Sequence, residues 1–414
     1  MVINNKKRWG YIIIGIIIMM CLGTVYSWSV FRLPIERHFN VGTSESGYPY
    51  MFSLAFYSLF VLLTGKYIEK YSPRKIISFG GVLVGIGWIL SAFAPNIYVL
   101  TVSYGMIIGS GVGIVYGVPM NVIAKWFPDK KGLAVGLVLV GFGLSPFITA
   151  PIASYLVETQ GVMNSFFIMG VAFLLIIPLL SIALKYPEVI QGSQADKDTS
   201  QNDCETKEMI KTRSFKGLYI NFIFGTMIGL MIIGITSNVG VELIKLSEGS
   251  VATLMSLFAV FNGIGRVGFG WITDKFSNKI AMRLSYTLIL VAAILMLMAG
   301  ENSEALYVVS FCIFWLNLGG WLAIAPTATM NLFGTKNYSK NYGVVFTAYG
   351  IGAIMGVIGS GMLKEAFGGY TGIFCFIVLI CIVGYVVIGY NSKESKKGIN
   401  INGEVKHENF EALN

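Results

Sequence analysis

One arginine, Arg266, interrupts an apolar stretch that runs from Phe261 to Gly270. If that stretch spans a membrane, the guanidinium costs roughly 2.5–3.5 kcal/mol on insertion scales, so such a residue normally faces a protein-lined cavity and marks an ion or substrate path. The 21 acidic residues of the chain fall in loops, in tails or at the ends of apolar runs. None of them is placed to neutralise Arg266 inside the membrane, and we therefore expect its counterion to be a bound small organic anion.

The competing interpretation is that Arg266 reaches the membrane interface. It lies eight residues before Asp274, which corresponds to about 12 Å along a helix. A long side chain covers part of that distance, so snorkelling or a purely structural role is the alternative. Asn262, four residues before Arg266, projects from the same helix face and could share a ligand with it, or instead form an interhelical hydrogen bond.

No other set of residues suggests chemistry. The chain has two histidines, one in a loop and one in the tail, and its five cysteines lack metal-ligand spacing. A Ser/His/acid set and a phosphate-binding loop are missing as well. We therefore expect no enzyme, no metal site and no cofactor, and transport would have to draw on a gradient.

The composition is that of an integral membrane protein. Of the 414 residues, 55% are hydrophobic and 12% are charged, with a mean hydropathy of +0.71, against about 25% charged residues in soluble domains. Hydropathy predicts an all-α membrane protein with about twelve spanning helices, six on each side of a polar segment. We expect a first half at 1–184, a flexible cytoplasmic linker at 185–215, a second half at 216–391 and a cytoplasmic tail at 392–414.

The net charge of +9 is distributed as a membrane topology requires, which argues against nucleic-acid binding. Apart from Arg266, four of the 30 lysines and arginines fall at one end of the predicted spans, and the other 25 fall at the opposite end. The four are Arg32, Arg37, Lys245 and Lys364. By the positive-inside rule the other end is cytoplasmic. We expect a multi-pass protein of the cell membrane with a retained first helix and both termini in the cytoplasm.

One loop sequence occurs twice, 205 residues apart, with a glycine followed by an acid at +4, a lysine at +5 and a base at +9. The residues are Gly65, Glu69, Lys70 and Arg74 in the first copy and Gly270, Asp274, Lys275 and Lys279 in the second. This repeat resembles the loop signature of the major facilitator superfamily, whose members pack two six-helix halves around a central site that opens alternately to each side. The resemblance implies that these acids and bases form cytoplasmic contacts that break during the conformational cycle. The alternative is a positive loop that only sets the topology.

A more specific resemblance rests on segments from both halves. They are Tyr26–Phe31, Gly113–Pro119, Ala124–Ala134, Asn262–Arg266 and the stretch from Phe333 to Gly350. These segments are similar to the oxalate:formate antiporter family, and the resemblance covers about residues 9–390. It implies a secondary transporter of small carboxylates.

The sequence departs from that family at Tyr349, where the oxalate-transporting members carry a lysine. A dicarboxylate would then leave one carboxylate unpaired in a low-dielectric site, at a cost of several kcal/mol. We therefore expect a monocarboxylate such as lactate, pyruvate or formate, held by the parallel donors of Arg266 and by the hydroxyl and ring of Tyr349. An oxalate:formate antiporter is the alternative, and a non-transporting anion sensor on the same fold is another.

Three further aromatic residues complete the candidate substrate site. Tyr116 is a polar aromatic residue at mid-span. Tyr26 and Trp28 are two residues apart and do not share a helix face, so at most one of them points at a cavity. The family resemblance favours Tyr26, and interfacial anchoring is the alternative for Trp28. The expected partners are a small carboxylate, membrane lipid and, in the case of symport rather than anion exchange, protons; we expect a monomer.

Overall fold

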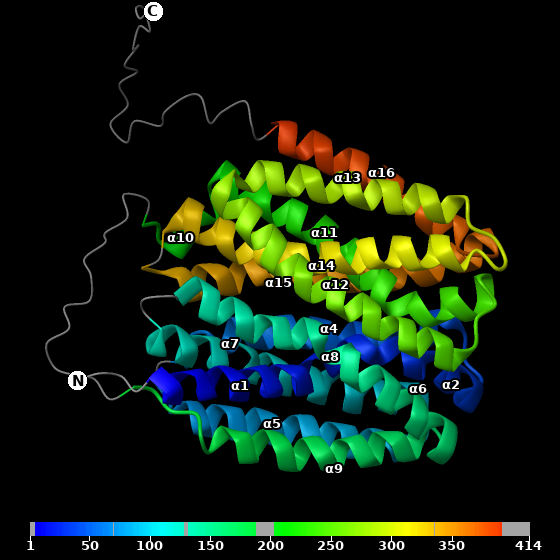
Figure 1. The fold of residues 1–414 in the computed structure, drawn as a ribbon, viewed down its shortest axis with the longest axis horizontal. Helices are drawn as coiled ribbons and strands as arrows, with labels where there is room; N and C mark the ends of the chain where they lie inside the picture. Colours follow the sequence, from blue (N-terminus) through cyan, green and yellow to red (C-terminus); the bar gives the residue numbers. More distant parts are fainter. Residues whose placement is uncertain (1–4, 69, 128–130, 188–202, 335, 391–414) are drawn as a thin grey trace, which may run out of the picture.

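The computed structural model describes residues 5–68, 70–127, 131–187, 203–334 and 336–390. Within these ranges every regular element is helical, and twelve segments are long and apolar enough to cross a membrane. The long helices run side by side along the long axis of the molecule (Figure 1). The predicted all-α fold with twelve spans is confirmed.

Six spans form the N-terminal half. The first span is not one continuous helix, because a 3₁₀ turn at Gly23–Ser27 (η1) separates α1 from α2. In the fourth span, a π-helical segment at Thr101–Ile108 (η2) joins α6 to α7. The helices are α1 (Asn5–Leu22), α2 (Trp28–Phe39), α3 (Thr43–Ser46), α4 (Tyr48–Thr64), α5 (Pro73–Ser91), α6 (Ile97–Leu100), α7 (Gly109–Trp126), α8 (Lys131–Gln160) and α9 (Val162–Ser181).

The C-terminal half also contains six spans. Its helices are α10 (Thr206–Met209), α11 (Arg213–Asn238), α12 (Glu248–Lys275), α13 (Asn278–Leu297), α14 (Glu304–Phe333), α15 (Tyr338–Phe367) and α16 (Thr371–Tyr390), and a π-helical turn, η4 (Val239–Leu243), follows α11. The N-terminal half lies below and the C-terminal half above in Figure 1. The two halves meet chiefly where α4 packs on α15 and α8 packs on α12. We call the end of the bundle at which α1 begins the terminal end, and the end at which α2 ends the far end.

Residues 188–202 of the flexible linker predicted at 185–215, and the predicted tail at 392–414, lie outside the described residues. The described C-terminal part of the linker differs from the prediction of flexibility. Residues 203–212 are folded onto the C-terminal half at the terminal end. The backbone N–H of Cys204 donates to the carbonyl of Phe333 at 3.1 Å, and the carbonyl of Cys204 accepts from the side-chain amides of Asn337 and Asn341 at 3.3 and 3.1 Å. Met209 is fully buried. The segment is thus held through the backbone of Cys204, which a reading of side-chain composition does not detect.

The helix that carries Arg266 contacts α14 backbone to backbone. A Cβ atom added at Gly265 would lie 1.9 Å from the carbonyl oxygen of Leu316, and one added at Gly319 would lie 2.0 Å from the carbonyl oxygen of Asn262. Small residues at a helix interface permit such close approach. Helices α12 and α14 therefore form a fixed pair within the C-terminal half.

Candidate functional site

Arg266 lies on α12 where this helix passes α8 of the other half. Its side chain is 5% exposed, and the guanidinium carbon lies 5.8 Å from the centre of the Phe142 ring. Its Nε donates to the side-chain oxygen of Asn262 at 3.3 Å. The terminal nitrogens Nη1 and Nη2 are buried and have no hydrogen-bond partner in the described part of the chain. The guanidinium thus points into the interface between the halves.

Asn262 holds this arginine in place. Its amide oxygen accepts the Nε hydrogen bond, and its amide nitrogen donates to the backbone carbonyl of Trp315 on α14 at 3.0 Å. The interhelical hydrogen bond expected as the alternative for Asn262 is therefore present, and it leaves the amide oxygen free to orient Arg266. With Nε engaged, the two unpartnered nitrogens face away from Asn262 as a parallel pair of donors.

Gly143 on α8, which was not among the predicted site residues, provides the space for Asn262 and Arg266. A Cβ atom at Gly143 would lie 2.4 Å from the amide oxygen of Asn262 and 2.9 Å from Nε of Arg266. Real Cβ atoms do not approach other atoms so closely, so any larger residue would displace one of these two side chains. The N-terminal half therefore leaves a gap into which the C-terminal half inserts its cation.

Two tyrosines bridge the halves beside Arg266. The hydroxyl groups of Tyr26, in η1, and Tyr349, in α15, are hydrogen-bonded at 2.9 Å, and both residues are fully buried. The Tyr26 ring also contacts Phe142 edge-on at 5.1 Å, so Tyr26 and Arg266 share a neighbour, and the arginine charge acts on the Tyr26 hydroxyl. A neutral pair of hydroxyl groups thus occupies the position where the sequence resemblance placed a second cation.

Further aromatic rings enclose these tyrosines. Tyr116 packs edge-on against Tyr57, with ring centres 5.0 Å apart, and Tyr57 packs in the same way against Tyr349 at 5.4 Å. Phe346 stacks on Tyr349 at 4.9 Å. Tyr57, Phe142 and Phe346 were not predicted, because nothing in the sequence separates them from the many aromatic residues that fill apolar spans.

Trp28 lies elsewhere. Its ring packs against Tyr104 and Phe166 inside the N-terminal half, and its indole nitrogen donates to the carbonyl of Ser46 at 3.3 Å. The structure therefore brings together Arg266, Asn262, Tyr26, Tyr116 and Tyr349, but it does not place Trp28 with them. This outcome follows from the two-residue spacing, which directs Tyr26 and Trp28 to different sides.

The repeated loops lie at the terminal end. Gly65 follows α4 and approaches the carbonyl of Ser339 on α15, whereas Gly270 lies within α12. Lys70, Arg74, Asp274 and Lys275 are exposed, Lys279 is half-buried, and Glu69 lies outside the described residues. The ammonium of Lys275 lies 4.7 Å from the Trp271 ring centre. Among the described residues none of these loop charges forms an ion pair, so the exchange of contacts expected from the resemblance stays a prediction.

Comparison with known proteins places this geometry in a family. A family model described as the Major Facilitator Superfamily matches residues 12–329 and 217–412. The chain is 27% identical over 351 residues to the oxalate:formate antiporter of Oxalobacter formigenes, covering 84% of this chain and 83% of that protein. It is 24% identical over 417 residues to monocarboxylate transporter 12 of Mus musculus, covering 92% and 85%.

A solved structure shows the same fold. The crystal structure of a bacterial homolog to the human lysosomal transporter Spinster, in an inward-facing and unoccupied conformation, matches with a TM-score of 0.75 at 14% identity, over 94% of this chain and 98% of that one. The family model matches well over half of the present chain. The chain therefore belongs to the Major Facilitator Superfamily and is a multi-pass membrane transporter.

Proposed function

We propose that this transporter carries small monocarboxylates, such as lactate, pyruvate or formate, and binds their carboxylate at Arg266. The observation that carries the proposal is the pair of buried nitrogens Nη1 and Nη2, which form no hydrogen bond to a described residue and have the neutral Tyr26 hydroxyl near them as a polar group. Two parallel N–H donors match the two oxygens of a carboxylate, and this bidentate geometry favours arginine over lysine. A buried cation without a counterion is costly, and an anionic substrate would remove that cost.

The Tyr26–Tyr349 pair supports the restriction to one negative charge. A second carboxylate at this place would meet two hydroxyl groups and aromatic rings rather than a cation. Hydroxyl groups can donate to a carboxylate but do not neutralise it, so a dicarboxylate would retain a buried charge. The small apolar or hydroxylated remainder of a monocarboxylate fits such surroundings.

Relatives support the substrate class and leave an alternative. One similar protein is named as an oxalate:formate antiporter and another as a monocarboxylate transporter. Exchange of oxalate for formate is therefore the second candidate. The same binding site is compatible with both proton symport and anion exchange. A sensor that binds the anion without transport is a minor candidate.

The charge of Arg266 couples substrate binding to the conformational change of the carrier. An empty carrier has an uncompensated cation between its two halves, and this cation resists burial when the halves close around it. A bound carboxylate neutralises the guanidinium, so closure and reorientation become easier with substrate than without it. This property favours movement of the loaded carrier. We assign the terminal end to the cytoplasm from the excess of lysine and arginine there, and we place the protein in the cell membrane as a monomer with both termini inside.

Uptake of labelled lactate into proteoliposomes tests the proposal. One set of vesicles has an imposed proton gradient and no internal anion, a second contains unlabelled lactate or formate, and vesicles without protein serve as the control. Accumulation driven by the proton gradient alone would identify monocarboxylate symport. Uptake that requires an internal monocarboxylate and resists oxalate would identify monocarboxylate exchange.

Two outcomes would contradict the proposal. Uptake that needs an internal anion and is strongly inhibited by oxalate would identify oxalate:formate exchange and refute the inference from Tyr349. Saturable binding without flux into sealed vesicles would identify a sensor.

A further inference from the structure

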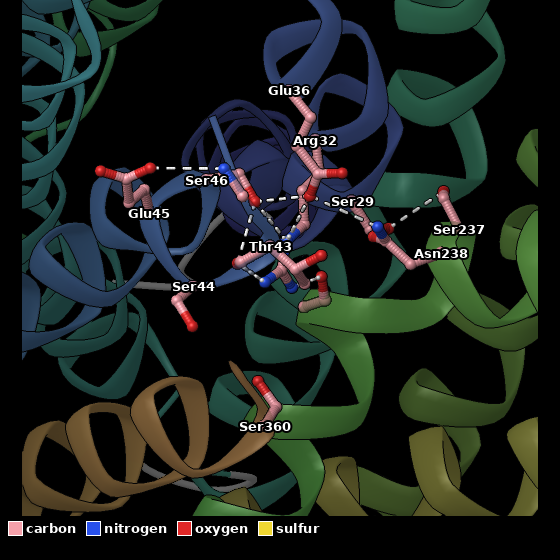
Figure 2. Close-up of polar contacts among 12 residues, drawn as sticks. Ser29, Arg32, Glu36, Thr43, Ser44, Glu45, Ser46, Ser237, Asn238 and Ser360 are labelled. Carbon is pink, nitrogen blue, oxygen red and sulfur yellow. Dashed lines mark hydrogen bonds and ion pairs between the residues drawn. The ribbon is translucent and has the colours of Figure 1, made fainter. Parts of the chain in front are cut away.

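A second arginine is buried more deeply than Arg266, and the proposed substrate site does not use it. Arg32 on α2 is 1% exposed and lies at the far end of the bundle. Its guanidinium donates from Nε to the hydroxyl of Ser46 at 3.0 Å, from Nη2 to the carbonyl of Thr43 at 2.5 Å and from Nη1 to the carbonyl of Gly234 at 2.7 Å (Figure 2). All three guanidinium nitrogens are therefore engaged.

One of these three hydrogen bonds crosses between the halves. Thr43 and Ser46 belong to α3, in the same half as Arg32, whereas Gly234 belongs to α11 of the C-terminal half. The carboxylate of Glu36, one helical turn after Arg32, lies 3.7 Å from its Nε. The arginine thus has its counterion in its own half and a neutral backbone acceptor in the other.

Lys364 on α15 shows the same arrangement in reverse. Its ammonium forms an ion pair with Glu242 at 2.7 Å within the C-terminal half and donates to the hydroxyl of Thr43 in the N-terminal half at 3.0 Å. The side-chain amide of Asn238 lies between the two carboxylates, 3.5 Å from Glu36 and 3.3 Å from Glu242. Asn238 is fully buried, and Figure 2 shows it beside the Arg32 cluster.

This distribution of charges has an energetic consequence. Breaking a buried ion pair leaves an uncompensated charge and is strongly unfavourable. Here Arg32, which is buried, and Lys364, which is half-buried, each keep their carboxylate when the halves separate, so that opening of the far end leaves neither cation without its counterion. The hydrogen bonds from these cations to neutral groups of the other half are stronger than neutral ones, yet they exchange readily for hydrogen bonds to water.

We propose that Arg32 is the latch of the far end, and that its hydrogen bond to the Gly234 carbonyl sets the equilibrium between closed and open states of this end. The proposal does not depend on the identity of the substrate or on Arg266. Lysine cannot replace Arg32 in this role, because a single ammonium does not reach Ser46, Thr43 and Gly234 together. The exposed cross-half ion pair between Arg37 and Glu248, at 2.6 Å, contributes little because its side chains are 65% and 35% exposed.

A cysteine introduced on the inner side of Arg32 reports the opening of the far end. Ser29 lies one turn of α2 deeper than Arg32, is fully buried, and contacts Ser237 and Met255 of the other half. We would introduce Ser29→Cys into a protein whose five native cysteines are replaced by serine, and measure the rate of its reaction with a membrane-impermeant maleimide added at the far-end side. The parent protein is compared with Arg32→Gln, Arg32→Lys and, as the matched control on the same helix, Arg37→Gln.

We expect both Arg32 variants to react about tenfold faster than the parent, as the loss of one charge-assisted hydrogen bond implies, and Arg37→Gln to react at the parent rate. Equal slow reaction in all variants would overturn the proposal, and so would equal acceleration by Arg37→Gln and Arg32→Gln. If neither Arg32 variant folds, the side chain is needed for folding rather than for the choice between states, and the latch role is refuted. Lactate uptake measured in parallel keeps this result separate from the test of Arg266.

Discussion

The hydroxyl groups of Tyr26 and Tyr349 lie 2.9 Å apart, although 323 positions separate the two residues in the chain. One belongs to the short 3₁₀ turn of the first span and the other to α15, so this single hydrogen bond joins the two halves beside Arg266. The bond is neutral at both ends. This neutrality is the basis for our proposal of a substrate with one negative charge.

Replacing Arg266 tests the proposed anion site directly. Arg266→Gln removes the charge and the parallel donors, and we expect the affinity for lactate to fall about 100-fold. Arg266→Lys keeps the charge but loses the bidentate geometry, so an intermediate loss is expected. Transport is measured in proteoliposomes, with the amount of inserted protein and its thermal stability as controls. Unchanged affinity in Arg266→Gln would exclude this residue as the binding site.

Replacing Tyr349 by lysine should change the substrate class. The new ammonium would lie close to Tyr26 and would supply a second cation, so that oxalate should inhibit lactate uptake at about tenfold lower concentration than in the wild type. Tyr349→Phe removes only the hydroxyl and should keep the preference for monocarboxylates. The measurement is competition by oxalate in both variants. Strong inhibition of the wild type by oxalate, or none in Tyr349→Lys, would contradict the role given to Tyr349.

Gly143 should tolerate no side chain, whereas Gly136 on the same helix should. A methyl group at Gly143 would collide with Asn262 and Arg266, and overpacking of this kind costs about 1–3 kcal/mol. At Gly136 a Cβ meets no atom within 4 Å. We expect Gly143→Ala to raise the KM for lactate about tenfold and Gly136→Ala to leave it unchanged. If the two variants behave alike, the gap at Gly143 has no role in holding the cation.

Residues 203–212 should detach when Asn341 is replaced. Asn341→Ala removes the hydrogen bonds to the Cys204 carbonyl and from the Thr206 hydroxyl, each worth about 1 kcal/mol. Lys207 and Lys211 are exposed, and we expect trypsin to cleave there about tenfold faster in the variant. The control is Ser78→Ala, which removes a hydrogen bond of comparable strength between Ser78 and Ser181, both of which lie within the N-terminal half. Equal cleavage rates in all three proteins would show that these hydrogen bonds do not hold the segment.

The fold and the isolated arginine could be predicted because each depends on a property that is local in sequence. The twelve spans follow from hydropathy, and the absence of a membrane-embedded acid near Arg266 follows from reading the acidic residues one by one. The orientation of Asn262 depends only on its i−4 spacing. These features need no knowledge of which helices meet.

The remaining features depend on contacts between helices that are far apart in the chain. Gly143 and Phe142 matter because α8 crosses α12 at their level, and one sequence does not show where that crossing lies. Arg32 could be counted as a far-end charge, but its bond to Gly234 requires the packing of α2 on α11. The folded segment at 203–212 uses side-chain amides bonded to backbone carbonyls, a pattern without periodicity or hydrophobic signal.

The close contact of α12 with α14 at Gly265 and Gly319 has a consequence for the affinities on the two sides of the membrane. Because Asn262 and Arg266 belong to one rigid helix pair, the C-terminal half offers the same donors whichever side is open. Any ratio between the dissociation constants measured from the two sides must then originate outside this helix pair, in residues such as Tyr26, Phe142 and Tyr349. The neutral residues would thus set any difference in substrate affinity between the two sides of the membrane, while Arg266 would contribute equally to binding from either side.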